Sequence, residues 1–151
     1  MPLTPGKINT FIAFKLPSAF LTGVRLKSIS QESCTTTVKH RWINQNPFNS
    51  MFWAVQGMAA ELATGALVMD EIKVQGKPVS MLVANNKANF SKKAKGRITF
   101  TCNDGLAIRQ AIQKAIASGE GQTCWMHAQG TNTDGVVVSS FDFEWTVKLR
   151  S

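Results

Sequence analysis

The chain has 151 residues, of which 44% are hydrophobic and 17% are charged, a balance that is ordinary for a globular protein and excludes a disordered chain. This length suits a single domain, 1–151, that buries a core without disulfides or metals, and no clean signal peptide, low-complexity tract or domain boundary is evident. The formal net charge of +8 favours an anionic partner, which leaves nucleic acid, a membrane surface or a phosphorylated small molecule as alternatives.

The chain is expected to begin with a helix over about 5–16. Apolar residues recur there at helical spacing, and Pro17 stops or kinks the helix. Two segments that suit strands follow, 24–29 and 34–41, and the second is rich in β-branched residues. The polar turn between them predicts an antiparallel hairpin.

A long apolar helix is predicted next, over Ser50 to Met69, with Asn49 or Ser50 as its N-cap. Between positions 41 and 70 the sequence has a single charged residue, Glu61. At about 1.5 Å per residue such a helix is long enough to cross a bilayer. A carboxylate in the middle of a span is costly, however, so we interpret the segment as a buried central helix and expect no membrane partner.

Four further strands and a surface helix complete the chain. Strands are predicted over 79–90 and 97–102, and the basic run Lys87 to Arg97 is expected at the tip of the hairpin that they form. An amphipathic helix within 103–119 follows, with an Asn or Asp in front and a glycine behind. The last two strands are predicted over 123–129 and 136–149, and the final one alternates strictly between apolar and polar residues.

This order predicts an α+β fold in which one antiparallel sheet of about six strands wraps around the long helix. Three cysteines fall within predicted strands and form no CxxC pair. We expect them to be buried free thiols in a reducing compartment, and the protein to be cytoplasmic. They are Cys34, Cys102 and Cys124.

Small residues flank the lone carboxylate of the long helix. Gly57 and Gly65 each lie four residues from Glu61, and each costs about 1 kcal/mol relative to alanine inside a helix. We therefore expect this flank to leave room for close packing or for a ligand. A carboxylate in an apolar groove is more basic than in water, which suits a general base or a nucleophile.

The element order and one residue spacing resemble the hot-dog-fold thioesterases, in which two subunits pair to form the sites. Acyl-CoA thioesterases of the phenylacetate-pathway type carry Asn, then His-Gly-Gly six residues later at the helix start, then Asp or Glu nine residues after the His. Here Asn46, Phe52-Trp53-Ala54 and Glu61 stand at those positions, so the His-Gly-Gly signature is absent. The chain looks closest to uncharacterised thioesterase-like members with an extra N-terminal helix. The resemblance implies a homodimer or a dimer of dimers.

The resemblance also implies a reaction, the hydrolysis of an acyl-CoA or a related thioester. Glu61 would act as general base or as nucleophile, and the backbone amide of Trp53 or Ala54 would stabilise the oxyanion at the positive end of the helix dipole. Asn46 would hold the water or the substrate carbonyl, with a turn role before Pro47 as the alternative.

Substrate contacts are expected in three places: the glycine-lined groove, a hydroxyl on the strand after the helix, and the basic run, which would hold the CoA phosphates. The residues concerned are Gly57, Gly65, Ser80, Lys87, Lys92, Lys93 and Arg97. No metal or cofactor is implied, because His40 and His127 belong to no metal-ligand or triad spacing.

Two other functions remain open from the sequence. One is a non-catalytic hot-dog module that holds an acyl or CoA ligand or serves as an assembly scaffold, which the missing His-Gly-Gly favours. The other is nucleic-acid binding through the positive charge, but no nucleic-acid motif accompanies that charge. The aromatic residues of the last strand alternate with charged ones and are better explained as sheet core, so no nucleic-acid partner is expected.

Overall fold

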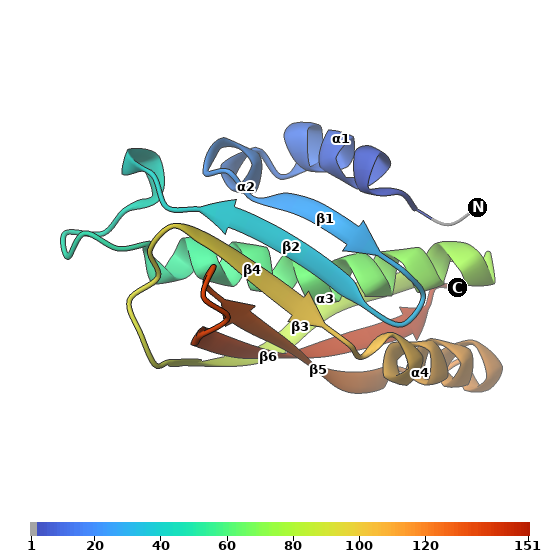
Figure 1. The fold of residues 1–151 in the computed structure, drawn as a ribbon. Coiled ribbons are helices and arrows are strands. Elements are labelled where there is room, and N and C mark those ends of the chain that lie inside the picture. The colour runs from blue at the N-terminus through green and yellow to red at the C-terminus, as the bar shows by residue number, and fades with distance from the viewer. Residues whose placement is uncertain (1–2) are drawn as a thin grey trace.

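A six-stranded antiparallel sheet curves around one long helix in the computed structural model, which describes residues 3–151 (Figure 1). The order of the strands in the sheet is β1-β2-β4-β5-β6-β3. The elements are α1 Pro5–Lys15, α2 Pro17–Leu21, β1 Arg25–Ile29, β2 Cys34–Lys39, η1 Trp42–Asn44, α3 Trp53–Gln75, β3 Val79–Phe90, β4 Arg97–Cys102, α4 Gly105–Ser118, β5 Gln122–Thr131 and β6 Val137–Leu149. The predicted α+β architecture, a sheet wrapped around a central helix, is confirmed.

The central helix α3 begins later than predicted. Its N-cap is Phe52, which offers no side-chain acceptor, and neither Asn49 nor Ser50 caps it. Asn49 instead adopts a left-handed conformation with φ of 59° in the loop before the helix. At the other end Gly76 forms a left-handed C-cap with φ of 68°.

The helix also ends later than predicted, because the charges that follow Met69 are buried and paired. The carboxylate of Asp70 accepts a hydrogen bond from the Leu3 amide at 2.7 Å. The carboxylate of Glu71 lies 3.2 Å from Arg109 Nε on α4. Since each carboxylate has a partner, burying it is affordable and the helix continues for another turn and a half.

The strands β3 and β4 do not form the predicted hairpin. β3 pairs with β6 along its length at one edge of the sheet, whereas β4 lies between β2 and β5. The segment 91–96 therefore crosses from the edge of the sheet to its interior. The basic run Lys87 to Arg97 therefore begins on β3, continues through this crossing and ends on β4, and is not gathered at a hairpin tip.

The two edges of the sheet are protected differently. At the β1 edge, Asn9 of α1 exchanges two hydrogen bonds with the backbone of Leu26, at 3.0 and 2.8 Å. β3 forms the other edge with 12 residues, and positions 84–90 are all exposed. β3 is thus a long open edge of the kind that readily pairs with another strand.

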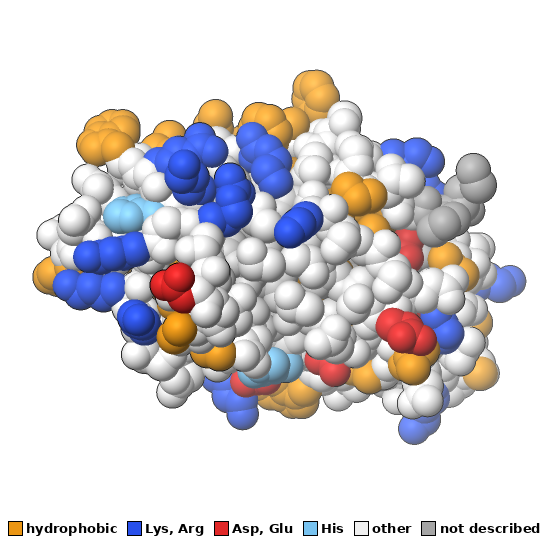
Figure 2. All heavy atoms as spheres, viewed as in Figure 1, with side chains coloured by type: hydrophobic (Ala, Val, Ile, Leu, Met, Phe, Trp, Pro, Cys, Tyr) orange, Lys and Arg blue, Asp and Glu red, His pale blue; other side chains and the backbone are white. Residues whose placement is uncertain are grey.

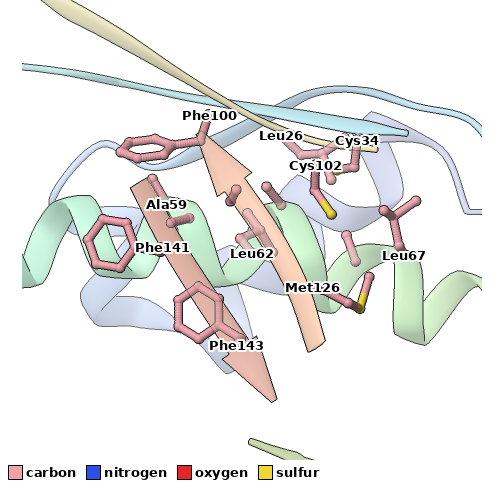
Figure 3. Packing of buried hydrophobic residues seen from close by; sticks show 14 of the residues in the cluster. Leu26, Cys34, Ala59, Leu62, Leu67, Phe100, Cys102, Met126, Phe141 and Phe143 are labelled. Carbon is pink, nitrogen blue, oxygen red and sulfur yellow. The ribbon is translucent and has the colours of Figure 1, made fainter. Parts of the chain in front are cut away.

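The core lies between the concave face of the sheet and α3. Figure 3 shows Phe100 of β4 and Phe141 and Phe143 of β6 packed beside the helix. Cys34 and Cys102 face each other across β2 and β4, are buried and free, and burial raises the pKa of both thiols to about 12. These thiols are therefore inert core side chains.

A glycine opposite Phe100 makes this packing possible. A Cβ at Gly130 of β5 would lie 2.5 Å from Phe100 Cε1, so we expect Gly130→Ala to force the ring aside and to lower the free energy of unfolding by about 1–3 kcal/mol. Gly6 of α1 is the matched control, because nothing lies within 4 Å of a Cβ there. Gly6→Ala is expected to stabilise the helix by about 0.5–1 kcal/mol. Urea denaturation of both variants tests this, and equal stability would contradict it.

Candidate functional site

Two cavities lie along the part of α3 that the sheet leaves uncovered. The first, here called the Glu61 groove, has a volume of about 530 Å³ and is mostly apolar. It is lined by Phe11, Lys15, Leu16, Pro17, Ser18, Ala19, Met58, Glu61, Leu62, Gly65, Met69, Met81 and Trp145. The second, here called the N-terminal cavity, has a volume of about 500 Å³. It is lined by Asn46, Pro47, Phe48, Ser50, Met51, Phe52, Trp53, Gln56, Phe90, Lys92, Lys93 and Ala94.

Glu61 is the only carboxylate in its groove. Its side chain is open to solvent on one side, while apolar neighbours such as Met58 and Leu62 withdraw it from water on the other. This desolvation raises the pKa of Glu61 above the ordinary value for a glutamate. Lys15 lines the same groove, but among residues 3–151 no cation lies within 4 Å of the carboxylate. Glu61 is therefore neither neutralised nor sealed, unlike Asp70 and Glu71 in the same helix.

The floor of the groove is fixed by a buried hydrogen bond. Trp145 Nε1 on β6 donates to Thr64 Oγ1 at 2.8 Å, and the Thr64 hydroxyl donates to the Glu61 carbonyl at 2.9 Å. A Cβ at Gly65 would lie 3.1 Å from the same indole, so the glycine allows the sheet to approach the helix. A Cβ at Gly57 would lie at an ordinary contact distance, 3.5 Å, from Phe141 Cε2, and Gly57 lines neither cavity.

Two backbone donors are free at the start of α3, where Phe52 and Trp53 line the N-terminal cavity and Ala54 does not. The amides of Val55 and Gln56 both donate to the Phe52 carbonyl, at 3.0 and 3.3 Å. Within residues 3–151 the amides of Trp53 and Ala54 have no acceptor, as expected for a helix without a side-chain cap. They add to the positive end of the helix dipole, which favours a developing negative charge.

Asn46 holds the loop that leads into α3. Its Oδ1 accepts from the amides of Phe48 and Ser50, at 2.9 and 3.2 Å. Its Nδ2 donates to Ser50 Oγ at 3.0 Å and to the Met51 carbonyl at 3.4 Å. With both amide hydrogens engaged, Asn46 holds the loop, as the turn role predicts, and its catalytic role stays a prediction.

The remaining candidates are separated. Lys92 and Lys93 line the N-terminal cavity, and Lys93 Nζ lies 3.4 Å from the Phe48 carbonyl. Lys87 lies on the outer face of β3, with Nζ 5.4 Å from the centre of the Trp125 ring. Arg97 and Ser80 line neither cavity, and Ser80 Oγ donates to the Lys148 carbonyl at 3.2 Å.

Within one protomer the helix start and the carboxylate do not meet. Trp53 and Glu61 are eight residues apart on a continuous helix, which corresponds to about 12 Å along its axis. A single carbonyl group cannot contact both. The two cavities are thus two halves of a possible site.

Sequence reasoning missed the wall of the Glu61 groove that α1 and α2 build. Phe11, Leu16 and Pro17 contribute to it, and the break between the two helices places them over α3. Phe11 and Leu16 remain exposed although they follow the helical period of α1. Pro17 predicts the break between the two helices, but the sequence around it does not predict that this corner lies over Glu61.

The histidines lie away from both cavities. His127 Nδ1 is 2.8 Å from Asp142 Oδ1 on the outer face of the sheet, and His40 lines no cavity described above. Residues 3–151 contain no group of three or more His, Cys, Asp or Glu side chains arranged to hold a metal ion. In the same part of the chain, no helix combines the length and apolar character that crossing a bilayer requires.

A family model matches residues 6–147, nearly the whole chain, and is described as a domain of unknown function, DUF4442. The chain belongs to the DUF4442 family. No functionally curated protein matches the sequence.

Solved structures show which fold this DUF4442 chain has. A Pseudomonas aeruginosa protein of unknown function, described as a "probable thioesterase", superposes with a TM-score of 0.83 at 22% identity over 99% of each chain. A Chlorobaculum tepidum protein of unknown function gives 0.83 at 16% identity over 99% of each chain. A Haemophilus influenzae thioesterase gives 0.72 at 12% identity, covering 99% of this chain and 93% of that one. The DUF4442 chain shares its fold with these proteins, and this fold is the hot-dog fold expected from the sequence.

The raised pKa of Glu61 predicts how pH changes stability. Because the folded-state pKa lies above the unfolded value, the stability that Glu61 contributes is present below the unfolded pKa and is lost as pH rises through the folded pKa. Glu61→Gln cannot ionise, so its stability relative to the parent chain should increase between about pH 4 and pH 7. Urea denaturation across this range measures the difference, and a difference independent of pH would refute the account.

Proposed function

We propose that the DUF4442 chain is a homodimeric hydrolase of acyl thioesters, with Glu61 as general base or nucleophile. The observation that carries the proposal is the unpaired carboxylate in an open apolar groove. As a base, Glu61 would take a proton from water while the water oxygen attacks the thioester carbonyl. As a nucleophile, it would attack the carbonyl itself and form an anhydride that water then cleaves. The thiolate leaves in either case and is protonated.

The free amides of Trp53 and Ala54 supply the second requirement, stabilisation of the oxyanion. A backbone N–H needs no glycine to donate, so the absence of His-Gly-Gly does not by itself remove the donor. Asn46 acts as a positioning residue, because its hydrogen bonds hold the loop that presents these amides. The apolar groove beside Glu61 would take the acyl chain.

A second copy of the chain would bring the two halves together. If α3 of a partner lies antiparallel beside this α3, the start of one helix approaches Glu61 of the other. The open edge of β3 supports this arrangement, because pairing two β3 strands about a two-fold axis would satisfy both edges and extend the sheet. A dimer of dimers would add a further interface to this unit.

The carrier of the acyl group is proposed to be coenzyme A. Lys92 and Lys93 line the N-terminal cavity, where they would attract its phosphates. Lys87, Arg97 and Ser80 are not part of this site within one protomer. Three free thiols fit a cytoplasmic location.

A second candidate function is binding without catalysis, and the side chain of Trp53 favours it. Trp53 is 57% exposed, lines the N-terminal cavity, and packs edge-on against Phe52 with ring centroids 6.0 Å apart. These rings stand where the resembled enzymes have His and Gly. If they block the amides, acyl-CoA would raise the melting temperature without release of thiol.

Two substitutions at Trp53 distinguish the contribution of its backbone amide from that of its indole side chain. Trp53→Pro removes the N–H, and the backbone tolerates it because Phe52 has φ of −60° and ψ of 135°, as a residue before proline requires. Trp53→Ala keeps the N–H. If this amide is the donor, thiol release from acyl-CoA substrates falls about 10²–10³-fold in Trp53→Pro but not in Trp53→Ala. Equal rates for the two variants would eliminate the Trp53 amide as the donor.

Mixing two inactive variants tests whether the site spans two subunits. Glu61→Gln is expected to lose about 10²–10⁴-fold in rate, and Trp53→Pro is impaired at the other half of the site. Refolding an equal mixture should restore about a quarter of the parent activity, because half of the dimers then contain one intact site. A site contained within one protomer predicts no recovery.

A further inference from the structure

We propose that the outer face of β1, β2 and β4, together with the tips of α2 and η1, binds the surface of an anionic membrane. This inference does not depend on the proposed hydrolase activity. It concerns peripheral contact and not a membrane-spanning segment.

A cluster of four cations, here called the basic patch, carries the charge. Its members are Arg25, Lys39, Arg41 and Arg97. Lys39 and Arg97 stand opposite each other in the pairing of β2 with β4. Arg97 Nη1 lies 3.3 Å from Thr37 Oγ1, and Thr37 in turn stands opposite Arg25 in the pairing of β1 with β2. Figure 2 shows Lys and Arg side chains gathered over this part of the sheet.

The charges of the basic patch are not compensated. Within residues 3–151, Arg109 is the single Lys or Arg with a carboxylate oxygen within 4 Å, and it belongs to α4. Burial lowers the pKa of Arg25, and the like charge of the nearby Arg41 lowers it further. Like charges placed side by side cost stability unless an anion lies between them. The patch therefore has the features of a binding surface for anions.

Apolar side chains project beside the basic patch. Trp42 and Ile43 of η1 directly follow Arg41, and Leu21 ends α2. Their exposed fractions are 82%, 51% and 67%. The two tips are joined, because Asn44 Nδ2 donates to the Thr22 carbonyl at 3.0 Å. A tryptophan, an isoleucine and a leucine thus project from neighbouring turns next to four cations.

This combination fits a lipid surface better than a macromolecule with a fixed shape. The three side chains are exposed on two neighbouring turns, where Leu21 lines none of the cavities and Trp42 and Ile43 border a small one of about 360 Å³. Apolar side chains on such turns can enter the headgroup region, while the adjacent cations attract anionic lipids. Tryptophan is enriched at the interface between membrane and water. A nucleic acid would use the cations but would leave the isoleucine and leucine in water.

The surface would remain available in the proposed dimer. β1 and β3 are opposite edges of the sheet, so pairing through β3 leaves the basic patch free. α1 lies along the free edge of β1, where Asn9 contacts the backbone of Leu26. It leaves the outer face of the strand uncovered (Figure 1).

Vesicle sedimentation tests this inference. The full chain is mixed with phosphatidylcholine vesicles that contain roughly a third phosphatidylglycerol, and with vesicles of phosphatidylcholine alone. We expect binding only to the anionic vesicles, weakening as salt is added. Lys39→Glu/Arg41→Glu should weaken it about tenfold, and Leu21→Ser/Trp42→Ser should weaken it with the net charge unchanged.

The control is Lys77→Glu/Lys114→Glu, which makes the same change in net charge at exposed positions outside the patch. Its binding to anionic vesicles should stay close to that of the parent chain, whereas the binding of the patch variant should fall. Three results would overturn the proposal: no binding to anionic vesicles at low salt, equal losses in the patch and control variants, or tighter binding of a single-stranded oligonucleotide or an acidic polypeptide than of vesicles.

Discussion

The cost of burying charge organises the central helix. α3 is enclosed by the sheet on most sides, so each carboxylate on it must find a partner or remain in contact with water. Asp70 accepts a hydrogen bond from the backbone amide of Leu3, and Glu71 forms an ion pair with Arg109. Glu61 has no cation beside it in the described part of the chain and is not sealed from water, and α1 and α2 leave a groove over it. Among residues 3–151, Glu61 is thus the one α3 carboxylate without a structural partner, and it lies where a ligand can reach it.

The same helix determines how a site can be assembled. Its uncapped start presents free amides, and its middle presents the carboxylate, about 12 Å away along the axis. The open edge of β3 offers a physical reason for two chains to associate beside this helix. Catalysis and assembly would therefore both depend on α3. How far the side chain of Trp53 blocks access to the free amides would decide how active the proposed dimer is.

Much of the fold follows from local pattern in the sequence. The alternation in β6, the glycine cap after α4 and the apolar length of α3 all predict their elements because burial and periodicity act on neighbours in the chain. The end of α3 and the separation of β3 from β4 do not follow. They depend on Arg109 and on β6, which lie tens of residues away, and no local signal encodes those contacts.

For the site, the isolation of Glu61 was visible in the sequence, whereas its surroundings were not. The sequence allows Asn46 to be either a catalytic amide or a turn residue, and its hydrogen bonds to Ser50 and Met51 support the turn role. The sequence did not show which residues of the basic run line a cavity and which lie on the outer face, because this depends on the path of segment 91–96. Lys92 and Lys93 belong to a cavity, and Lys87 and Arg97 to the outer face.

The central claim is that the Glu61 carboxylate performs the chemistry, and the pH dependence of kcat/KM for an acyl-CoA substrate tests it most directly. Because desolvation raises the pKa of Glu61, the rate should rise with pH through a midpoint above the ordinary pKa of a glutamate, and the same midpoint should appear when the carboxyl is titrated by NMR. A rate that is flat across that range, or a midpoint unrelated to the titration of Glu61, would contradict the account.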